Sequence, residues 1–149
     1  MSLKEEITTG VKQAMKAGEK VRLQTLRFLL SAVKNKEIDK RAELSEAEIL
    51  QVISTSVKQH KDSIEQFRKG GRVDLASKEE AELEVLTGFL PPQLSEDEIK
   101  DVVASTATEL GAETMKDMGG LMKAVMARLK GRADGKLVQA AVKQRLAGQ

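Results

Sequence analysis

The chain has 149 residues and a formal net charge of +2, with 40% hydrophobic and 32% charged residues. This composition is typical of a globular protein, and a chain of this length buries roughly 68–70% of its unfolded surface. The absence of cysteine excludes disulfides, thiolate metal sites and a cysteine nucleophile. With three phenylalanines and no tyrosine or tryptophan, base-stacking platforms, aromatic cages and β-rich cores are all disfavoured.

The N-terminal residues 1–6 (MSLKEE) carry acidic residues where a signal peptide needs basic and then apolar ones. The densest apolar run, residues 28–33, is far shorter than the roughly 20 residues that span a bilayer. We therefore expect a soluble, cytoplasmic protein with no membrane partner.

Apolar residues at helical spacing predict helices from the N-terminus onward. The first helix follows a capping box formed by Ser2 and Glu5 and ends before Gly18. The second helix runs from about residue 19 to residue 37. Its apolar residues surround much of the helix, which predicts burial on most sides. They are Val21, Leu23, Leu26, Phe28, Leu29, Leu30 and Val33.

The third predicted helix has the clearest start, because Ser45 is an N-cap with Glu48 completing its capping box. It ends at Gly70-Gly71. A second serine and glutamate pair, Ser77 and Glu80, predicts the start of a fourth helix that ends before Pro91-Pro92.

The same cap sequence then recurs at Ser95 and predicts a fifth helix that Gly111 ends. A sixth helix is predicted over residues 114–129 and a seventh after the N-cap Asp134. No segment shows the two-residue alternation of a strand. We predict an all-α, multihelical fold with an N-terminal helical domain (1–92) and a smaller three-helix C-terminal domain (93–149).

Few residues point to catalysis. His60 is the single histidine and lies on the inner face of the third helix, which favours a core or interface role. Without a second histidine or any cysteine, no metal site, cofactor or catalytic residue is predicted. The glutamates of the fourth helix are interpreted as its solvated face and first turn. They are Glu79, Glu80, Glu82 and Glu84. The run 131–136 is not a nucleotide-binding P-loop: it is one residue too short, Leu137 stands where serine or threonine must bind Mg²⁺, and no strand precedes it.

Positive charge is concentrated near the C-terminus. Residues 123–145 contain seven basic residues and one acidic residue, Asp134. The basic residues are Lys123, Arg128, Lys130, Arg132, Lys136, Lys143 and Arg145. Two lysine pairs with seven-residue spacing flank the turn 131–135, where Gly131 and Gly135 allow close backbone approach. This pattern favours a phosphate-binding surface, with a merely solubilising surface as the alternative.

Three runs resemble the GatB/YqeY family: residues 27–35 (RFLLSAVKN), 90–99 (LPPQLSEDEI) and 130–138 (KGRADGKLV). Together the resemblance covers essentially the whole chain. Gly131, Ala133, Asp134, Gly135, Lys136 and Val138 match the family's C-terminal motif. The resemblance implies an all-helical, two-part fold similar to the C-terminal tail region of the glutamyl-/aspartyl-tRNA amidotransferase B subunit. That region is associated with gripping tRNA.

The resemblance carries no catalytic residues to this sequence, because the amidotransferase chemistry occurs in a part of that subunit with no counterpart here. The family label of carbon–nitrogen ligase with glutamine as amido donor would be inherited by name. Our first hypothesis is a non-catalytic module that binds tRNA or another structured RNA through the seven basic residues. The lack of tyrosine and tryptophan argues against reading of unstacked bases.

The second hypothesis is a protein-interaction adaptor that docks on aminoacylation or amidotransferase machinery. Its candidate surface is the acidic stretch from Asp74 to Glu84 or a hydrophobic groove near the domain boundary. Salt dependence separates the two hypotheses, because phosphate contacts weaken steeply with salt whereas apolar contacts do not.

Overall fold

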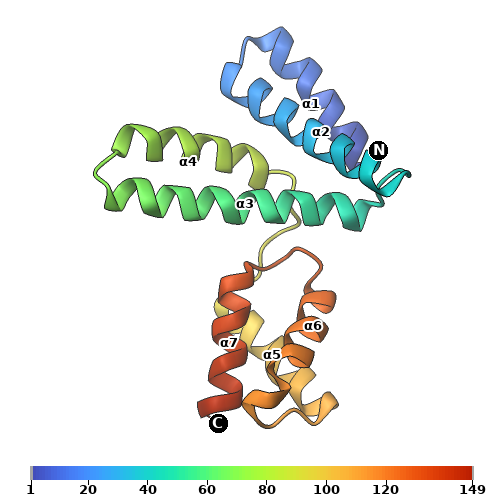
Figure 1. The fold of residues 1–149 in the computed structure, drawn as a ribbon, viewed down its shortest axis with the longest axis vertical. Helices are drawn as coiled ribbons and strands as arrows, with labels where there is room; N and C mark the ends of the chain where they lie inside the picture. The colour runs from blue at the N-terminus through green and yellow to red at the C-terminus, as the bar shows by residue number, and fades with distance from the viewer. Residues whose placement is uncertain (1, 149) are drawn as a thin grey trace. The chain divides into compact units, whose positions relative to one another are not determined.

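The computed structural model describes residues 2–148, and all regular structure in that range is helical, which confirms the all-α prediction. The elements are α1 (Leu3–Ala17), α2 (Lys20–Lys40), α3 (Glu46–Lys69), α4 (Val73–Thr87), α5 (Glu96–Leu110), the 3₁₀ helix η1 (Met115–Asp117), α6 (Met118–Leu129) and α7 (Gly135–Gly148) (Figure 1). None of these helices is both long and apolar enough to cross a membrane.

The chain divides into two compact units, Met1–Leu90 and Pro91–Gln149. The first unit contains α1 to α4 and the second contains α5 to α7. Each unit buries a hydrophobic cluster of its own residues.

The first unit consists of two helical hairpins, α1 with α2 and α3 with α4 (Figure 1). Its core is built from fully buried aliphatic side chains of all four helices, among them Ile7, Leu26, Ile53 and Leu86. Gly10 allows α1 and α2 to approach closely, because a Cβ atom there would lie only 2.9 Å from Leu26 Cδ1.

The predicted capping boxes are present at the starts of α1, α3 and α5. At α3 the Glu48 N–H donates to Ser45 Oγ at 3.2 Å, and the Ser45 N–H donates to Glu48 Oε1 at 3.0 Å. Two of the backbone donors that a helix start leaves without helical partners are thereby satisfied. These predicted helix starts are confirmed.

The predicted start of α4 at Ser77 is wrong, because the helix begins one turn earlier, at Val73. Asp74 lies in its first turn, where a carboxylate interacts favourably with the helix dipole, and it forms an ion pair with Arg72 at 3.2 Å. A start at Val73 therefore needs no serine cap. Ser77 lies inside the helix and is exposed.

Burial of α2 on most sides is also not observed. The side chains that it buries lie on one face, which includes Leu26, Leu29 and Val33. By contrast, Val21 is 44% exposed and Phe28 is 68% exposed. The helices packed against α2 belong to its own unit and leave its other face open to solvent.

The second unit packs α5, α6 and α7 around a core that includes Val103, Val125 and Val142. Its sixth predicted helix is divided: Thr114 precedes η1, and α6 begins only at Met118. The segment after Leu90 is tied to the α6–α7 turn. The Leu94 N–H donates to the Arg132 carbonyl at 2.8 Å.

Candidate functional site

The seven basic residues that the sequence singles out are all exposed, and we call them the C-terminal basic surface. They are Lys123 and Arg128 on α6, Lys130 and Arg132 in the following turn, and Lys136, Lys143 and Arg145 on α7. On both helices the apolar face is turned into the core, where Val125 and Val138 are fully buried. The cations therefore lie on the sides of α6 and α7 that the core leaves open.

The two arginines nearest the turn are engaged within the unit. Arg128 forms an ion pair with Glu109 of α5 and donates from Nη1 to Thr106 Oγ1 at 3.0 Å. The hydrogen bond to Arg128 lowers the pKa of Glu109, and the same contact raises the pKa of Arg128. Arg132 donates from Nε to the Leu129 carbonyl at 3.1 Å, at the C-terminal end of α6. Arg128 thus links α6 to α5, and Arg132 caps the C-terminal end of α6.

The lysines of this surface are arranged differently. Lys123, Lys130 and Lys143 form no ion pair with any residue in the part of the chain that the structure describes. Lys136 and Lys143 lie two helical turns apart on the outward side of α7. Lysine ammonium groups are flexible point charges suited to phosphate oxygens. The lysines are therefore the better candidates for contacts with an external anion.

The turn between α6 and α7 is hydrogen-bonded to the segment that precedes α5. Lys130 and Gly131 both have left-handed backbone angles, with φ of 46° and 80°. The Gln93 side chain donates from Nε2 to the Gly131 carbonyl at 3.0 Å. These contacts restrain the backbone to which Lys130 and Arg132 are attached.

Asp134 is the N-cap of α7, as predicted. Its Oδ1 accepts a hydrogen bond from the Lys136 N–H at 2.8 Å, and its carbonyl accepts one from the Val138 N–H at 3.1 Å. Gly135 follows as the first helical residue. The cap thus occupies a helix-start N–H group and places a negative charge there, which disfavours binding of a phosphate at the start of α7.

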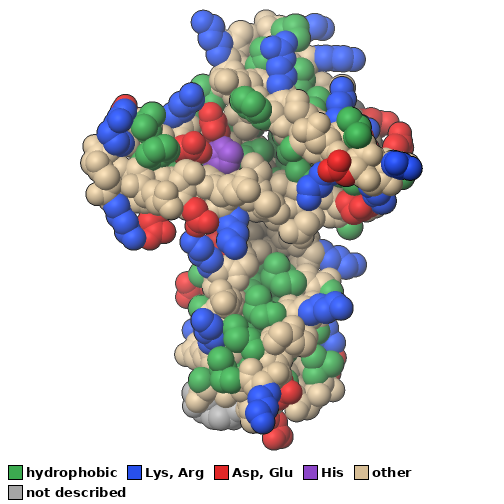
Figure 2. Space-filling view, viewed as in Figure 1, with side chains coloured by type: hydrophobic (Ala, Val, Ile, Leu, Met, Phe, Trp, Pro, Cys, Tyr) green, Lys and Arg blue, Asp and Glu red, His purple; other side chains and the backbone are tan. Residues whose placement is uncertain are grey.

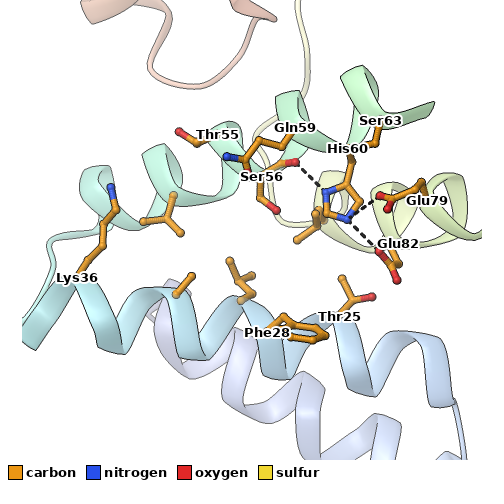
Figure 3. Close-up of a pocket in the computed structure, with 14 residues that line it drawn as sticks. Thr25, Phe28, Lys36, Thr55, Ser56, Gln59, His60, Ser63, Glu79 and Glu82 are labelled. Atoms are coloured by element: carbon orange, nitrogen blue, oxygen red, sulfur yellow. Dashed lines mark hydrogen bonds and ion pairs between the residues drawn. The ribbon is translucent and has the colours of Figure 1, made fainter. Parts of the chain in front are cut away.

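A second candidate site lies in the first unit, where α2, α3 and α4 border a cavity of about 490 Å³ (Figure 3). Its lining is mixed: Phe28 and Leu86 are apolar, whereas Thr25, Gln59 and His60 are polar. On the face drawn in Figure 2, basic side chains are spread over both units, and the single histidine is visible beside acidic side chains.

His60 lies on the wall of this cavity with both ring nitrogens in contact with oxygen atoms. Nδ1 is 2.8 Å from the Ser56 carbonyl oxygen. Nε2 is 3.0 Å from Glu82 Oε2 and 3.4 Å from Glu79 Oε2 (Figure 3). The three side chains are between 20% and 26% exposed. The core or interface role predicted for His60 thus takes the form of a polar cluster that links α3 to α4.

The interpretation of Glu79 and Glu82 as solvated residues is wrong, because this face of α4 packs against α3. The sequence did contain a signal for the contact. His60 and Glu82 lie the same number of residues before and after Gly71, and residues equidistant from the turn of a helical hairpin tend to face each other. Glu80 is also engaged, in an ion pair with Arg68.

Comparisons with known proteins identify relatives along nearly the whole chain. The family model described as Yqey-like protein matches residues 4–146. The protein named "Altered inheritance of mitochondria protein 41, mitochondrial" from Lachancea thermotolerans is 43% identical over 103 residues. That match covers 67% of this chain and 55% of the relative.

Proteins of the same name from two other fungi are also similar. The one from Vanderwaltozyma polyspora is 38% identical over 115 residues, covering 72% of this chain and 62% of the relative. The one from Pyrenophora tritici-repentis is 32% identical over 129 residues, covering 85% and 71% respectively. The chain thus spans less than two thirds of the first two relatives.

These names correct the expected cytoplasmic location, because they describe mitochondrial proteins and point to mitochondria rather than the cytoplasm. The expectation rested on the lack of a secretory signal and of a long apolar run. Neither feature distinguishes the cytoplasm from the interior of an organelle. On the strength of the family match and of these relatives, the chain belongs to the YqeY-like protein family.

Proposed function

We propose that the unit Pro91–Gln149 binds structured RNA through the phosphate groups of the RNA and performs no chemistry on it. The observation that carries this proposal is the C-terminal basic surface, in which seven exposed cations accompany one acidic residue, Asp134, over residues 123–145. Asp134 is engaged in capping α7, so its charge lies at the helix start. Contacts of lysine and arginine with phosphate dominate the affinity of most nucleic-acid-binding proteins.

Within this surface we assign the phosphate contacts to the lysines Lys123, Lys130, Lys136 and Lys143. Arg145 is also exposed and supports them from another side of α7, about half a turn around the helix axis from Lys136. Arg128 and Arg132 are assigned a positioning role, because their guanidinium groups are hydrogen-bonded within the unit. The positioning role of the two arginines follows from these hydrogen bonds, and the assignment of Lys136 from its two-turn spacing with Lys143.

We propose that the RNA bound by this unit is tRNA. Residues 90–99 and 130–138 resemble the tail region of the tRNA-dependent amidotransferase B subunit, which is associated with gripping tRNA. A rigid helical surface without tyrosine or tryptophan suits recognition of a folded RNA by shape and phosphate position. The relationship to that tail region is part of the proposal.

The test is a filter-binding titration of the full chain with bulk tRNA over a series of salt concentrations. Engagement of about 3–5 phosphates gives a log–log slope of about −2 to −4. The double variant Lys123→Glu/Lys143→Glu should bind more weakly and with a shallower slope. Lys12→Glu/Lys58→Glu, which changes two exposed lysines of the first unit, is the matched control and should bind like the wild type.

Two results would overturn the proposal: no binding of tRNA at low salt by the folded wild type, or equal losses in the two double variants. Either would show that the C-terminal basic surface does not hold the RNA.

One observation favours the alternative, a protein-interaction adaptor for aminoacylation or amidotransferase machinery. Phe28 is 68% exposed on α2 and borders a groove together with Leu23 and Arg27. The acidic stretch is the weaker candidate surface, because Asp74, Glu79, Glu80 and Glu82 all have basic or histidine partners. An adaptor that docks through Phe28 would bind its protein partner with little dependence on salt.

A further inference from the structure

Three potential metal ligands converge on the cavity of the first unit: His60 Nε2, Glu79 Oε2 and Glu82 Oε2. These atoms all lie within 4.8 Å of one another (Figure 3). The histidine comes from α3, and the two glutamates are three residues apart on α4, which places them on one face of that helix. The α3–α4 hairpin therefore presents all three atoms to a common point.

The separations suit a small divalent ion. Zinc binds imidazole nitrogen and carboxylate oxygen at about 2.0–2.2 Å, so neighbouring ligand atoms in a tetrahedral site lie about 3.3–3.6 Å apart. The Nε2 atom of His60 is 3.0 Å from Glu82 Oε2 and 3.4 Å from Glu79 Oε2. The ligand atoms of all three residues lie within 4.8 Å of one another, so the two glutamate side chains would have to move closer together to bind one ion.

The hydrogen bond at the other ring nitrogen of His60 prepares Nε2 for this role. The Ser56 carbonyl can only accept, so Nδ1 at 2.8 Å must donate to it. In the neutral imidazole this leaves the Nε2 lone pair directed at the two carboxylates. Histidines that bind metals are typically oriented by such a contact from the nitrogen that does not bind.

The charges of the cluster also suit a cation. Two carboxylates face Nε2 in a half-buried cluster. Burial of carboxylates is costly unless their charge is compensated. A divalent ion would contact all three groups at once and neutralise both carboxylates.

We propose that His60, Glu79 and Glu82 bind a divalent first-row transition-metal ion, with Zn²⁺ as the representative. A mixed imidazole and carboxylate set favours such ions over Mg²⁺ or Ca²⁺, which prefer oxygen ligands alone. Three protein ligands leave a coordination position for water or for an oxygen atom of a bound molecule, as in catalytic zinc sites. The cavity of about 490 Å³ beside the cluster is large enough for a small molecule.

No metal site is predicted from the sequence, because histidine and cysteine are too few to form one and Glu79 and Glu82 are interpreted as solvated residues. Metal binding at this cluster does not depend on RNA binding, since the cluster belongs to the first unit and the C-terminal basic surface to the second.

The test is isothermal titration calorimetry of the untagged full chain with ZnCl₂. The key variant is Glu82→Gln, because glutamine keeps the side-chain length and polarity but lacks the negative charge. Glu84→Gln, an exposed glutamate on the same helix, is the matched control. Wild type and Glu84→Gln should bind one ion each. Glu82→Gln should bind zinc at least about tenfold more weakly. Loss even of a residue that only hydrogen-bonds a metal ligand typically lowers metal affinity ~10–100-fold.

Cobalt provides an independent readout, because Co²⁺ bound to nitrogen and oxygen ligands absorbs visible light. The absorption expected for the wild type should be lost in His60→Gln and retained in Glu84→Gln. Circular dichroism checks that each variant is folded, and Glu79→Gln replaces Glu82→Gln if the latter unfolds. No zinc binding by the wild type, or equal affinities in wild type and the folded ligand variant, would overturn the proposal and leave the cluster as a hydrogen-bonded link between α3 and α4.

Discussion

Arg128 on α6 forms an ion pair with Glu109 on α5. From the sequence alone, this arginine is one of the seven basic residues predicted to bind RNA. Its second terminal nitrogen donates to the hydroxyl of Thr106, a side chain that is fully buried. The Thr106 hydroxyl in turn donates to the Val102 carbonyl at 2.7 Å. Arg128 thus satisfies a buried acceptor and joins two helices of the second unit.

We expect Arg128→Met to lower the urea midpoint of unfolding, because it leaves Glu109 without its ion-pair partner and removes the donor to Thr106. Lys123→Met removes the same charge from the same helix but breaks no ion pair. It should leave the midpoint unchanged and weaken tRNA binding more than Arg128→Met does. Urea titrations followed by circular dichroism and filter binding measure the two effects. The reverse order of the effects would contradict the division into positioning arginines and phosphate-binding lysines.

A pH dependence is expected from the start of α3. Lys40 donates a hydrogen bond to Glu48, and with the Ser45 N–H it lowers the pKa of Glu48 from 4.5 to about 2. A pKa lowered in the folded state means that the ionised carboxylate favours folding. This contribution is complete above about pH 4.5 and is lost as the pH falls towards about 2.

Glu48→Gln should therefore lower the stability at neutral pH, and its difference from the wild type should shrink steadily as the pH falls from about 4.5 to about 2. Urea unfolding at several pH values measures the difference. The exposed Glu43→Gln serves as the control and should match the wild type. A difference that stays constant with pH would mean that Glu48 acts through packing rather than through its charge.

Two glycines within helices should respond oppositely to alanine. At Gly120 in α6 a Cβ atom would meet nothing within 4 Å, so Gly120→Ala should stabilise the protein by about 0.5–1 kcal/mol through helix propensity. At Gly10 the new methyl group would lie 2.9 Å from Leu26, which is fully buried. Overpacking costs about 1–3 kcal/mol, so Gly10→Ala should lower the stability by up to about 2 kcal/mol. Stabilisation by both substitutions would show that α1 and α2 are not tightly packed at Gly10.

The corrected start of α4 has a simple consequence for two serines. Ser95 accepts a hydrogen bond from the Glu98 N–H as the N-cap of α5, so Ser95→Ala should cost about 1 kcal/mol. Ser77 is exposed inside α4, where alanine is the better helix former, so Ser77→Ala should be neutral or slightly stabilising. Chemical denaturation compares the pair. A loss at Ser77 as large as that at Ser95 would restore Ser77 as a helix start.

The helix starts that could be predicted are those made by residues close together in the sequence. The capping boxes at Ser45 and Ser95 depend on contacts within four residues, so the sequence pattern identified them correctly. At Val73 an acidic first turn takes the place of the serine cap. The Ser77 pattern therefore placed the start of α4 one turn too late.

The cluster around His60 could not be predicted in the same way. It depends on which face of α4 packs against α3, and a one-residue rotation of either helix would move Glu79 or Glu82 into solvent. The equal sequence separation of His60 and Glu82 from Gly71 predicts that they lie at the same level of the hairpin. It does not give the rotation of either helix about its own axis. For the same reason, the spacing of basic residues placed Arg128 on a charged surface without showing that α5 supplies its partner.

The exposed ring of Phe28 marks a position where a fluorescent side chain would report on binding. Phe28 borders the cavity that holds His60 and also the groove on α2, and the chain has no tryptophan or tyrosine of its own. A Phe28→Trp variant would therefore contain a single tryptophan, which would border both the cavity and the groove. Its fluorescence would be quenched by a paramagnetic ion in the cavity and shifted by a protein that covers α2, so one side chain would distinguish the two events.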